Sequence, residues 1–434
     1  MGPAVAAFAG NPLIKDIGMS DPHVRAFEDK VYLYCGHDDS PTDRLWVMKE
    51  WRVFSSTNLI NWNLETTISP KDNYMADDSI GCWACEAATR NGKFYFYFSD
   101  RDRSAGVMES DSPGGPFVDK RGTPLVDKHD PTVFVDDDEN ETPYIIYGDK
   151  HGNLDYQIAQ LNDDMSSLAE KPKKIIINGK EWDNAPVWQD KNYLFKRNGI
   201  YYLSWGRDYA ISKNVYGPYE TVGAVGNGHN LNGYAHGSFF EWKGQFYHIW
   251  CYYINGHRLK FRDTIISYTH FTDDGKIVTD TEFLDKHFSN GVGQYDANWP
   301  EIEAEWFYEK SAGIVKKEKK GDGFMLDNIG NDAYLVFPNI KNLVVAKTLT
   351  FNVQPSQSNS QDKNNKTRIE VRDSSPSGKL LTTCYVPDAA SSAFIDVSCE
   401  LPPQSSKVSL AFVFKGDGDN LLKFNKLAFT PVTK

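Results

Sequence analysis

The sequence predicts an all-β chain: a five-bladed β-propeller followed by a β-sandwich of the jelly-roll kind. Two observations predict the propeller. Alternating β-branched and aromatic runs occur throughout, and one pattern of an aromatic-rich strand, a turn and a second strand recurs five times. The repeats start about 46 to 63 residues apart, which is the length of a propeller blade and not of a helical repeat.

The repeats fill the first two thirds of the chain. We expect the aromatic strand of each repeat to begin, in order, at Val31, Phe94, Tyr144, Ile200 and Phe246. A second strand follows each of them, as WRVFSSTNLINW follows the first. A propeller arranges its blades around one axis, so short polar segments far apart in sequence converge on one pocket.

The composition of the chain changes near residue 300. The fifth repeat ends near Gly275, and a polar, glycine-containing connector follows it. From Ile302 onward, seven short alternating runs (IEAEWF, AYLVFPNI, TLTFNVQ, TRIEVRD, SAFIDVS, VSLAFVFKG and LLKFNKLAF) are separated by polar turns. This spacing is typical of a β-sandwich. We therefore expect a propeller domain over residues 1–295 and a sandwich over 302–434.

The composition of the chain indicates which classes of molecule the protein is expected to bind. The net charge of −12 disfavours nucleic acid and anionic membranes, and 14% aromatic residues suit a neutral polyol such as a sugar. The six cysteines lack zinc-ribbon spacing and are expected to be buried thiols. No segment has the length of a membrane-spanning helix. The opening MGPAVAAFAGNPLI lacks the basic start of a signal peptide, so we expect the mature form of an exported protein. We also expect the protein to be a monomer.

Acidic and histidine side chains lie just upstream of the aromatic strands. Asp21, Asp190 and His236 each precede the second residue of an aromatic strand by the same interval, and Asp130 and Glu86 hold related positions. If these upstream segments are the innermost strands of their blades, all five side chains reach the axial opening.

Carboxyl groups gathered in this way suit glycoside cleavage with inversion. One carboxylate activates a water molecule and a second carboxyl protonates the leaving oxygen, at a separation of about 6.5–9.5 Å. A third carboxylate nearby raises the pKa of the acid and orients it. Asp-Pro dipeptides also start turns, but here two of them, in DPHV and HDPTVF, hold equivalent repeat positions.

Several phrases resemble glycoside hydrolase family 43. They are DPHV, VFSSTNLINW, CWACEAATRNGKFYFYFS, ESDSPGGPF, HDPTVFVDDD, YLFKRNGIYYLS and HGSFFEWKGQFYH, in the family's order over nearly the whole first domain. The resemblance implies a five-bladed propeller and an inverting mechanism. Typical activities are β-xylosidase, α-L-arabinofuranosidase, arabinanase and exo-β-1,3-galactanase.

The resemblance also implies roles for individual residues. Asp21 matches the general base, and Asp130 matches the acid that tunes pKa and orientation. His236 matches an axial histidine that contacts the sugar or lies beside a central calcium ion. Arg262, in KFRDTIISY, resembles an arginine that often contacts the substrate, and Glu86 stands where many relatives carry an acidic residue.

The general acid departs from the family pattern. The family usually has a Glu in an E-G-P phrase, whereas this chain has Asp190 within APVWQDKNYLFKRNG. Asp reaches one methylene less far than Glu, and catalysis is sensitive to that reach. Three alternatives stay open. Asp190 is the acid, or Glu181, Asp183 or Glu86 supplies the proton, or the protein binds sugar and hydrolyses little.

Aromatic residues are candidate sugar-stacking platforms. Near the inner strands these are Trp83, Trp182, Trp188 and Trp205, although tryptophans also fill propeller cores. In the second domain, the opening IEAEWF and the phrase DNIGNDAYLVFPNI resemble carbohydrate-binding modules of family 6, in which an aromatic near the position of Tyr334 stacks on sugar. The glutamates of the opening phrase, here Glu303 and Glu305, bind a structural calcium ion there. The last strand, FNKLAFTP, lacks the family's Trp and Asp, so a purely structural sandwich is an equal alternative.

Together these observations predict a secreted, periplasmic or cell-surface, inverting, exo-acting glycoside hydrolase that requires no cofactor, with a structural calcium ion as the one candidate metal. We expect an oligosaccharide or polysaccharide substrate of plant or algal origin, cleaved by an α-L-arabinofuranosidase or β-xylosidase. The alternatives are an exo-β-galactosidase or galactanase, and a non-catalytic sugar-binding propeller.

Overall fold

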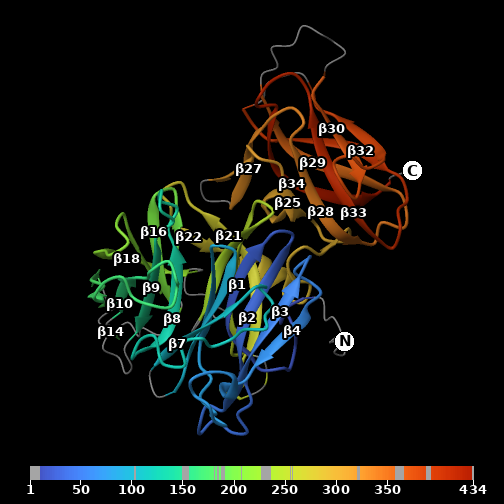
Figure 1. Cartoon of the computed structure of the whole chain (residues 1–434). Helices are drawn as coiled ribbons and strands as arrows, with labels where there is room; N and C mark the ends of the chain where they lie inside the picture. The colour runs from blue at the N-terminus through green and yellow to red at the C-terminus, as the bar shows by residue number, and fades with distance from the viewer. Residues whose placement is uncertain are drawn as a thin grey trace. The chain divides into compact units, whose positions relative to one another are not determined.

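The computed structural model is built almost entirely of β-strands (Figure 1). Within the described part of the chain, α1 (Thr281–His287) is the only α-helix, and no helix there is long and apolar enough to cross a membrane. The structure describes residues 10–101, 104–148, 156–179, 191–206, 208–225, 236–254, 256, 258–319, 323–356, 366–387 and 392–432, and the backbone of 181–182 and 185–186.

Five successive antiparallel sheets follow the five sequence repeats (Figure 1). The first three are β1 to β4 (Met19–Phe27, Lys30–Asp38, Met48–Ser56, Asn63–Ile68), β5 to β7 (Cys85–Arg90, Lys93–Ser99, Ala105–Ser110) and β8 to β11 (His129–Val135, Pro143–Gly148, Gln157–Gln160, Lys173–Lys174). The aromatic strand predicted in each of these repeats is the second strand of its sheet.

The last two sheets are β15 to β18 (Asn192–Arg197, Ile200–Trp205, Asp208–Ser212, Tyr219–Ala224) and β19 to β22 (Gly237–Trp242, Gln245–Tyr252, Asp263–Phe271, Ile277–Thr279). A short strand, β12 (Ile177–Asn178), adds to the fourth sheet parallel to β18. In sequence, β12 and β15 are separated by two short strands, β13 (Glu181–Trp182) and β14 (Ala185–Pro186), which pair antiparallel with each other.

The first strands of the five sheets form a closed ring. β1 contacts β5, β5 contacts β8, and β8 contacts β15. The Tyr193 hydroxyl of β15 donates to the Phe239 carbonyl of β19 (2.6 Å), and the Val24 N–H of β1 donates to Ser238 Oγ of β19 (3.0 Å). The sheets are therefore the blades of a five-bladed propeller, and the segments upstream of the aromatic strands are its innermost strands.

The N-terminal segment ties the ring to its fifth blade. Asn11 exchanges hydrogen bonds with the Ile266 backbone of β21 through both of its side-chain amide atoms (2.9 Å each). The Leu13 N–H donates to the Thr264 carbonyl (2.9 Å). These long-range contacts join the start of the propeller to its last blade and so help to close the ring of blades.

The C-terminal residues form two further sheets (Figure 1). One contains β23 (Tyr295–Asp296), β28 (Tyr334–Lys341), β33 (Lys407–Lys415), β30 (Arg368–Asp373) and β31 (Leu380–Tyr385), with β25 (Glu309–Lys310) beside β28. The other contains β26 (Val315–Glu318), β27 (Phe324–Ile329), β34 (Leu422–Pro431), β29 (Lys347–Pro355) and β32 (Ile395–Leu401), with β24 (Ile302–Glu303) beside β34.

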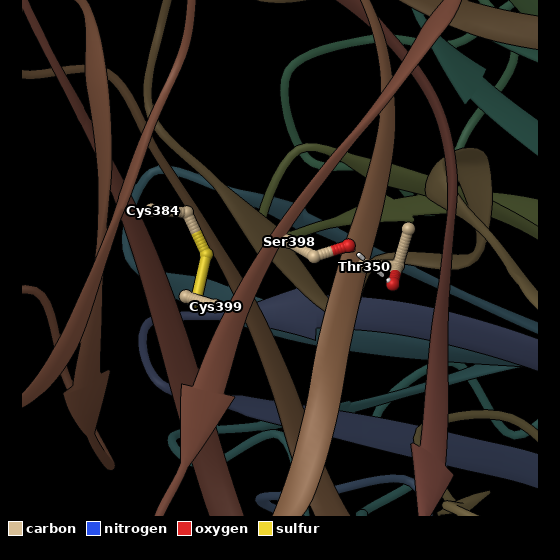
Figure 2. Close-up of a disulfide and its surroundings, with 4 residues drawn as sticks. All are labelled: Thr350, Cys384, Ser398 and Cys399. Atoms are coloured by element: carbon tan, nitrogen blue, oxygen red, sulfur yellow. Dashed lines mark hydrogen bonds between the residues drawn. A yellow bond between two sulfur atoms is a disulfide. The ribbon is translucent and has the colours of Figure 1, made fainter. Parts of the chain in front are cut away.

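Two features of this region differ from the prediction. The phrase IEAEWF continues as a strand only over β24 and then turns into a 3-10 helix (Ala304–Trp306), where the buried Trp306 indole donates to Asp280 Oδ2 (2.5 Å). The expectation of six thiols is wrong for two of them, because Cys384 of β31 and Cys399 of β32 form a disulfide (Figure 2). The other four cysteines are buried thiols, as predicted.

The chain divides into two compact units. The first contains Met1–Phe240, Tyr247–Ser267 and Thr281–Ser289. The second contains Glu241–Phe246, Tyr268–Asp280 and Asn290–Lys434, so the ends of several fifth-blade strands are grouped with the C-terminal sheets.

Candidate active site

Two backbone irregularities turn acidic side chains toward the propeller axis. The pairing of β1 with β2 shifts register around Asp21, and the pairing of β8 with β9 shifts register around Asp130. Both residues have positive φ, 48° and 53°, a conformation in which Asp is enriched among non-glycine residues. Each is followed by a proline, and β-bulges of this kind re-aim side chains beside active sites. The two Asp-Pro dipeptides thus mark the same feature in two blades, a β-bulge with an aspartate at positive φ.

Asp21 is buried and holds its carboxylate in a fixed position. Its Oδ1 accepts from Arg262 Nη1 (2.9 Å) and lies 3.1 Å from His236 Nδ1, while its backbone N–H donates to Cys251 Sγ (3.1 Å). Burial alone would raise the pKa of Asp21, but the Arg262 guanidinium and His236 outweigh it and hold this pKa well below its usual range. Asp21 is therefore an ionised carboxylate at neutral pH.

Asp130 is fixed by its neighbours in the second and third blades. Its backbone N–H donates to Ser99 Oγ (2.8 Å), and the Ser99 hydroxyl lies 3.4 Å from Oδ1. His129 Nε2 lies 3.8 Å from Oδ2. The side chain is buried, so these contacts restrict the directions in which the carboxyl group can point.

One cavity, of about 410 Å³, brings together three of the five predicted axial residues, Asp21, Asp130 and His236. Its polar lining consists of Asp21, His129, Asp130, His236 and Arg262. Its apolar lining consists of Trp46, Met48, Trp83, Ala84, Tyr253 and Leu259. A mostly apolar pocket with a few convergent polar groups is the usual form of a small-molecule site.

His236 reaches the cavity from the start of the fifth blade. It is followed by Gly237, where a Cβ atom would lie 1.9 Å from the Ile249 carbonyl oxygen of β20. Only glycine allows this close approach. The tight pairing sets His236 beside Asp21, as the sequence position implied.

Glu86 was expected at the axial opening, but it does not line the cavity. Its carboxylate is fully buried, 2.7 Å from His23 Nε2 and 3.0 Å from Arg25 Nη2. β5 pairs with β6 in unbroken register, so no bulge turns Glu86 toward the axis. Burial outweighs the attraction of Glu86 and lowers the pKa of His23 to about 4. The structure thus gives Glu86 an ion-pair position between the first two blades.

Three of the four candidates for the general acid have side chains outside the described part of the structure. Asp190, Asp183 and Trp188 lie outside them, and for Glu181 and Trp182 only the backbone of β13 is described. Lys191, directly after Asp190, is buried and donates through Nζ to Thr132 Oγ1 (2.8 Å). The assignment of Asp190 as the acid stays a prediction.

Of the tryptophans considered as platforms, Trp83 lines the cavity and packs edge-on against His129, with ring centroids 5.6 Å apart. Trp205 lies instead in the hydrophobic core between the third and fourth blades. Trp46, Tyr253 and Leu259 are cavity residues that the sequence analysis did not identify. Their one sequence signal is position, since they lie in the polar connections between β2 and β3 and between β20 and β21.

The residues proposed for calcium do not form a metal site on their own. Glu305 is buried with Oε2 lacking a hydrogen-bond partner, and burial together with Glu303 raises its pKa well above the usual range. Calcium takes six to eight oxygen ligands. Among the described residues, no group of three or more His, Cys, Asp or Glu could hold a metal ion, either here or at His236.

Tyr334 lies in the second unit at the start of β28 and is half-buried. Its hydroxyl donates to Glu309 Oε1 (3.2 Å), and its backbone N–H donates to Ser311 Oγ (2.9 Å). The ring is therefore held through its hydroxyl by Glu309, and the backbone at this residue is held by Ser311. Sugar binding by Tyr334 stays a prediction.

Curated relatives are similar over the propeller. A xylosidase/arabinosidase of Bacteroides ovatus is 26% identical and covers 60% of this chain and 94% of its own length. Xylosidase/arabinosidase 43A of Humicola insolens is 28% identical and covers 62% of this chain and 98% of its own. An arabinoxylan arabinofuranohydrolase of Paenibacillus polymyxa, 24% identical, covers 98% of this chain and 74% of its own length.

Solved structures support the fold of both parts. A family 43 arabinoxylan arabinofuranohydrolase from Bacillus subtilis, in complex with cellotetraose, superposes with a TM-score of 0.56 at 23% identity over 99% of each chain. A β-xylosidase/α-arabinofuranosidase from a compost metagenome, in complex with xylotriose and in a calcium-free form, superposes with a TM-score of 0.54 at 27% identity. It covers 63% of this chain and 97% of its own.

The family model for glycosyl hydrolases family 43 matches residues 9–277, which include the five propeller blades almost completely and both bulged aspartates. The match covers more than half of the chain. The chain therefore belongs to glycosyl hydrolases family 43 and is a glycoside hydrolase.

Proposed function

We propose that this enzyme is an inverting, exo-acting α-L-arabinofuranosidase or β-xylosidase that acts on oligosaccharides from plant or algal polysaccharides. The observation that carries the proposal is the axial cavity, into which two bulged strands direct Asp21 and Asp130. Relatives named xylosidase/arabinosidase and β-xylosidase support the choice of pentose.

In the proposed reaction Asp21 is the general base. Its ionised carboxylate takes a proton from a water molecule as the water oxygen attacks the anomeric carbon from the face opposite the leaving group. The glycosidic C–O bond breaks, and the leaving oxygen receives a proton from the general acid. We assign that acid to Asp190, with Glu181 and Asp183 as alternatives.

Asp130 is proposed to orient the acid and raise its pKa. A carboxylate near a second carboxyl group disfavours ionisation of that group, which keeps it protonated and ready to donate. Asp130 is suited to this task because its backbone N–H donates to Ser99 Oγ (2.8 Å) and His129 Nε2 lies 3.8 Å from its Oδ2, which restricts the position of the carboxyl group.

A panel of aryl glycosides tests the substrate. We expect hydrolysis of the nitrophenyl α-L-arabinofuranoside or β-D-xylopyranoside, and a loss of at least about 10³-fold in kcat for Asp21→Asn. Hydrolysis of the β-D-galactopyranoside alone would favour a galactanase. Failure to cleave any member, with sugar binding intact, would favour a non-catalytic propeller.

The acid is identified by leaving-group dependence. Nitrophenolate leaves with little protonation, whereas an unactivated disaccharide needs a proton. Of Asp190→Asn, Glu181→Gln and Asp183→Asn, the variant of the true acid should lose much more activity on xylobiose than on the nitrophenyl glycoside. Equal losses on both substrates for Asp190→Asn would contradict its assignment.

For the second unit we propose a sandwich like the carbohydrate-binding modules of family 6, in an exported protein. Its two six-stranded sheets support the first part, and the Cys384–Cys399 disulfide supports export, because such bonds persist in oxidising compartments. Weaker retention of full-length Tyr334→Ala on insoluble arabinoxylan would support sugar binding there, and unchanged retention would oppose it. Fractionation of producing cells tests export.

A further inference from the structure

Arg262, a charged residue of the cavity described above, is hydrogen-bonded to protein through both its side chain and its backbone. Its Nε and Nη2 donate to the two oxygens of Asp38 (2.8 and 2.9 Å), in a bidentate pair, and Nη1 donates to Asp21 Oδ1 (2.9 Å). The Arg262 backbone N–H also donates to Asp38 Oδ2 (2.9 Å). Asp38 is completely buried, so this pair is desolvated and geometrically restricted.

The remaining N–H groups of Arg262 are directed to sulfur. Nη1 lies 3.8 Å from Cys251 Sγ and Nη2 lies 3.9 Å from Met48 Sδ. A guanidinium has five N–H groups, and the three contacts with carboxylates and two with sulfur account for all five. Arg262 thus has no N–H group left for a hydroxyl of a bound sugar.

The faces of the guanidinium are covered as well. Its carbon lies 4.3 Å from the centre of the Trp46 ring and 6.0 Å from that of Tyr253, and the residue is only 4% exposed. Trp46 and Tyr253 line the cavity together with Arg262, so their rings are available to a sugar there.

We propose that Asp38 is a positioning residue that fixes Arg262, and that Arg262 acts on the carboxylate of Asp21 and not on the substrate. This inference rests on the proposed role of Asp21 as the base. Arg262 and His236 both engage Oδ1. Among the described residues none hydrogen-bonds Oδ2, so the fixed carboxylate presents Oδ2 to the attacking water.

The proposal predicts that loss of this positioning lowers kcat and leaves KM nearly unchanged. A base displaced by about 1 Å can cost about 10²-fold in rate, because attack needs the water and the base in one geometry. Substrate affinity depends on other cavity residues and should change little. A residue that bound the sugar equally in ground and transition states would instead change KM and leave kcat unaltered.

The test compares Asp38→Asn with the matched control Asp39→Asn in the full-length enzyme. Asp39 is the next residue, but its carboxylate is exposed and pairs with Lys49 (2.6 Å) away from the cavity. We expect Asp38→Asn to lower kcat about 10²-fold with KM changed by less than about threefold, and Asp39→Asn to behave as wild type. Arg262→Lys, which keeps the buried positive charge, should likewise lower kcat and leave KM nearly unchanged.

A rise in KM of tenfold or more with unchanged kcat, in either Asp38→Asn or Arg262→Lys, would overturn the proposal and make Arg262 a substrate ligand. Failure of both variants to fold, while Asp39→Asn folds, would make the pair a structural ion pair and would also overturn it. Asp21→Asn separates this result from the proposed function. If that variant keeps its activity the base assignment is wrong, whereas an inactive Asp21→Asn beside unaffected Asp38 and Arg262 variants removes only this inference.

Discussion

At the scale of single residues, the site depends on aspartates in a backbone conformation that most residues avoid. Asp21 and Asp130 both adopt positive φ in register shifts at the start of an innermost strand. Asn and Asp tolerate this region because their short polar side chains make local hydrogen bonds. Function and local stability are therefore coupled at the same two positions.

Substitutions at Asp130 separate these two contributions. Asp130→Asn keeps the left-handed propensity and removes the charge, whereas Asp130→Ala removes both. We expect both variants to lose most of their activity, and Asp130→Ala to be less stable than Asp130→Asn by about 1 kcal/mol. Urea unfolding measures the difference. Equal stabilities would show that the backbone at residue 130 is not strained for Ala.

Residue positions could be predicted only where the repeats supplied a register. Asp21 and His236 reach the cavity, as their equal offsets from the aromatic strands suggested, and so does Asp130, whose offset is longer. Glu86 has a shorter offset and lies in a regular strand, and the absence of a bulge from β5 cannot be read from sequence. The pairing of Arg262 with Asp38 joins residues 224 positions apart, and no local pattern indicates it.

At the scale of elements, the aromatic strands stabilise the blades by stacking. In β20 the His248 ring packs between Phe239 and Trp250, with ring centroids 4.2 Å apart on each side. Burial lowers the pKa of His248 to about 3. This residue is neutral in the folded protein over the physiological range of pH.

A histidine of this kind makes the fold sensitive to acid. Its folded pKa is below its unfolded value of about 6.5, so its contribution is complete above that pH and is lost as the pH falls toward 3. As the pH falls from 7 to 5, protonation of His248 in the unfolded chain should lower the free energy of unfolding by about 2 kcal/mol. His248→Phe should therefore lose less stability than wild type over this interval in chemical denaturation. An identical loss in the two proteins would contradict this explanation.

The elements that the sequence revealed are those whose pattern is local. All five aromatic strands have the predicted place as second strands of their blades. The strands missed in the second unit include β26 and β27, which flank a lysine-rich stretch of sequence, and β31, whose residues Leu380 to Tyr385 alternate weakly. Their pairing comes from neighbouring strands, which a single run of sequence does not display.

At the scale of the whole molecule, each of the two units has its own covalent and packing constraints. The disulfide lies in the second unit and joins an edge strand of one sheet, β31, to an edge strand of the other, β32 (Figure 2). The residues that line the axial cavity lie in the first unit. Stability of the sandwich and chemistry of the cavity should therefore respond to different substitutions.

Removal of the disulfide tests this independence. The bond closes a loop with a sequence separation of 15 residues, for which chain-entropy arguments give about 3 kcal/mol. The double variant Cys384→Ala, Cys399→Ala should unfold its second unit at lower temperature in calorimetry and keep wild-type kcat on an aryl glycoside. A matching loss of kcat at temperatures where the variant is folded would contradict the expected independence.

The central claim is that the axial cavity cleaves glycosides with inversion, through a water molecule activated by Asp21. The most direct measurement is ¹H NMR of the first sugar anomer released by the wild-type enzyme, recorded before mutarotation. From a β-D-xylopyranoside we expect α-D-xylose first, because water attacks opposite the leaving group. Initial release of β-D-xylose would mean that a carboxylate attacks the sugar directly, and would contradict the role assigned to Asp21.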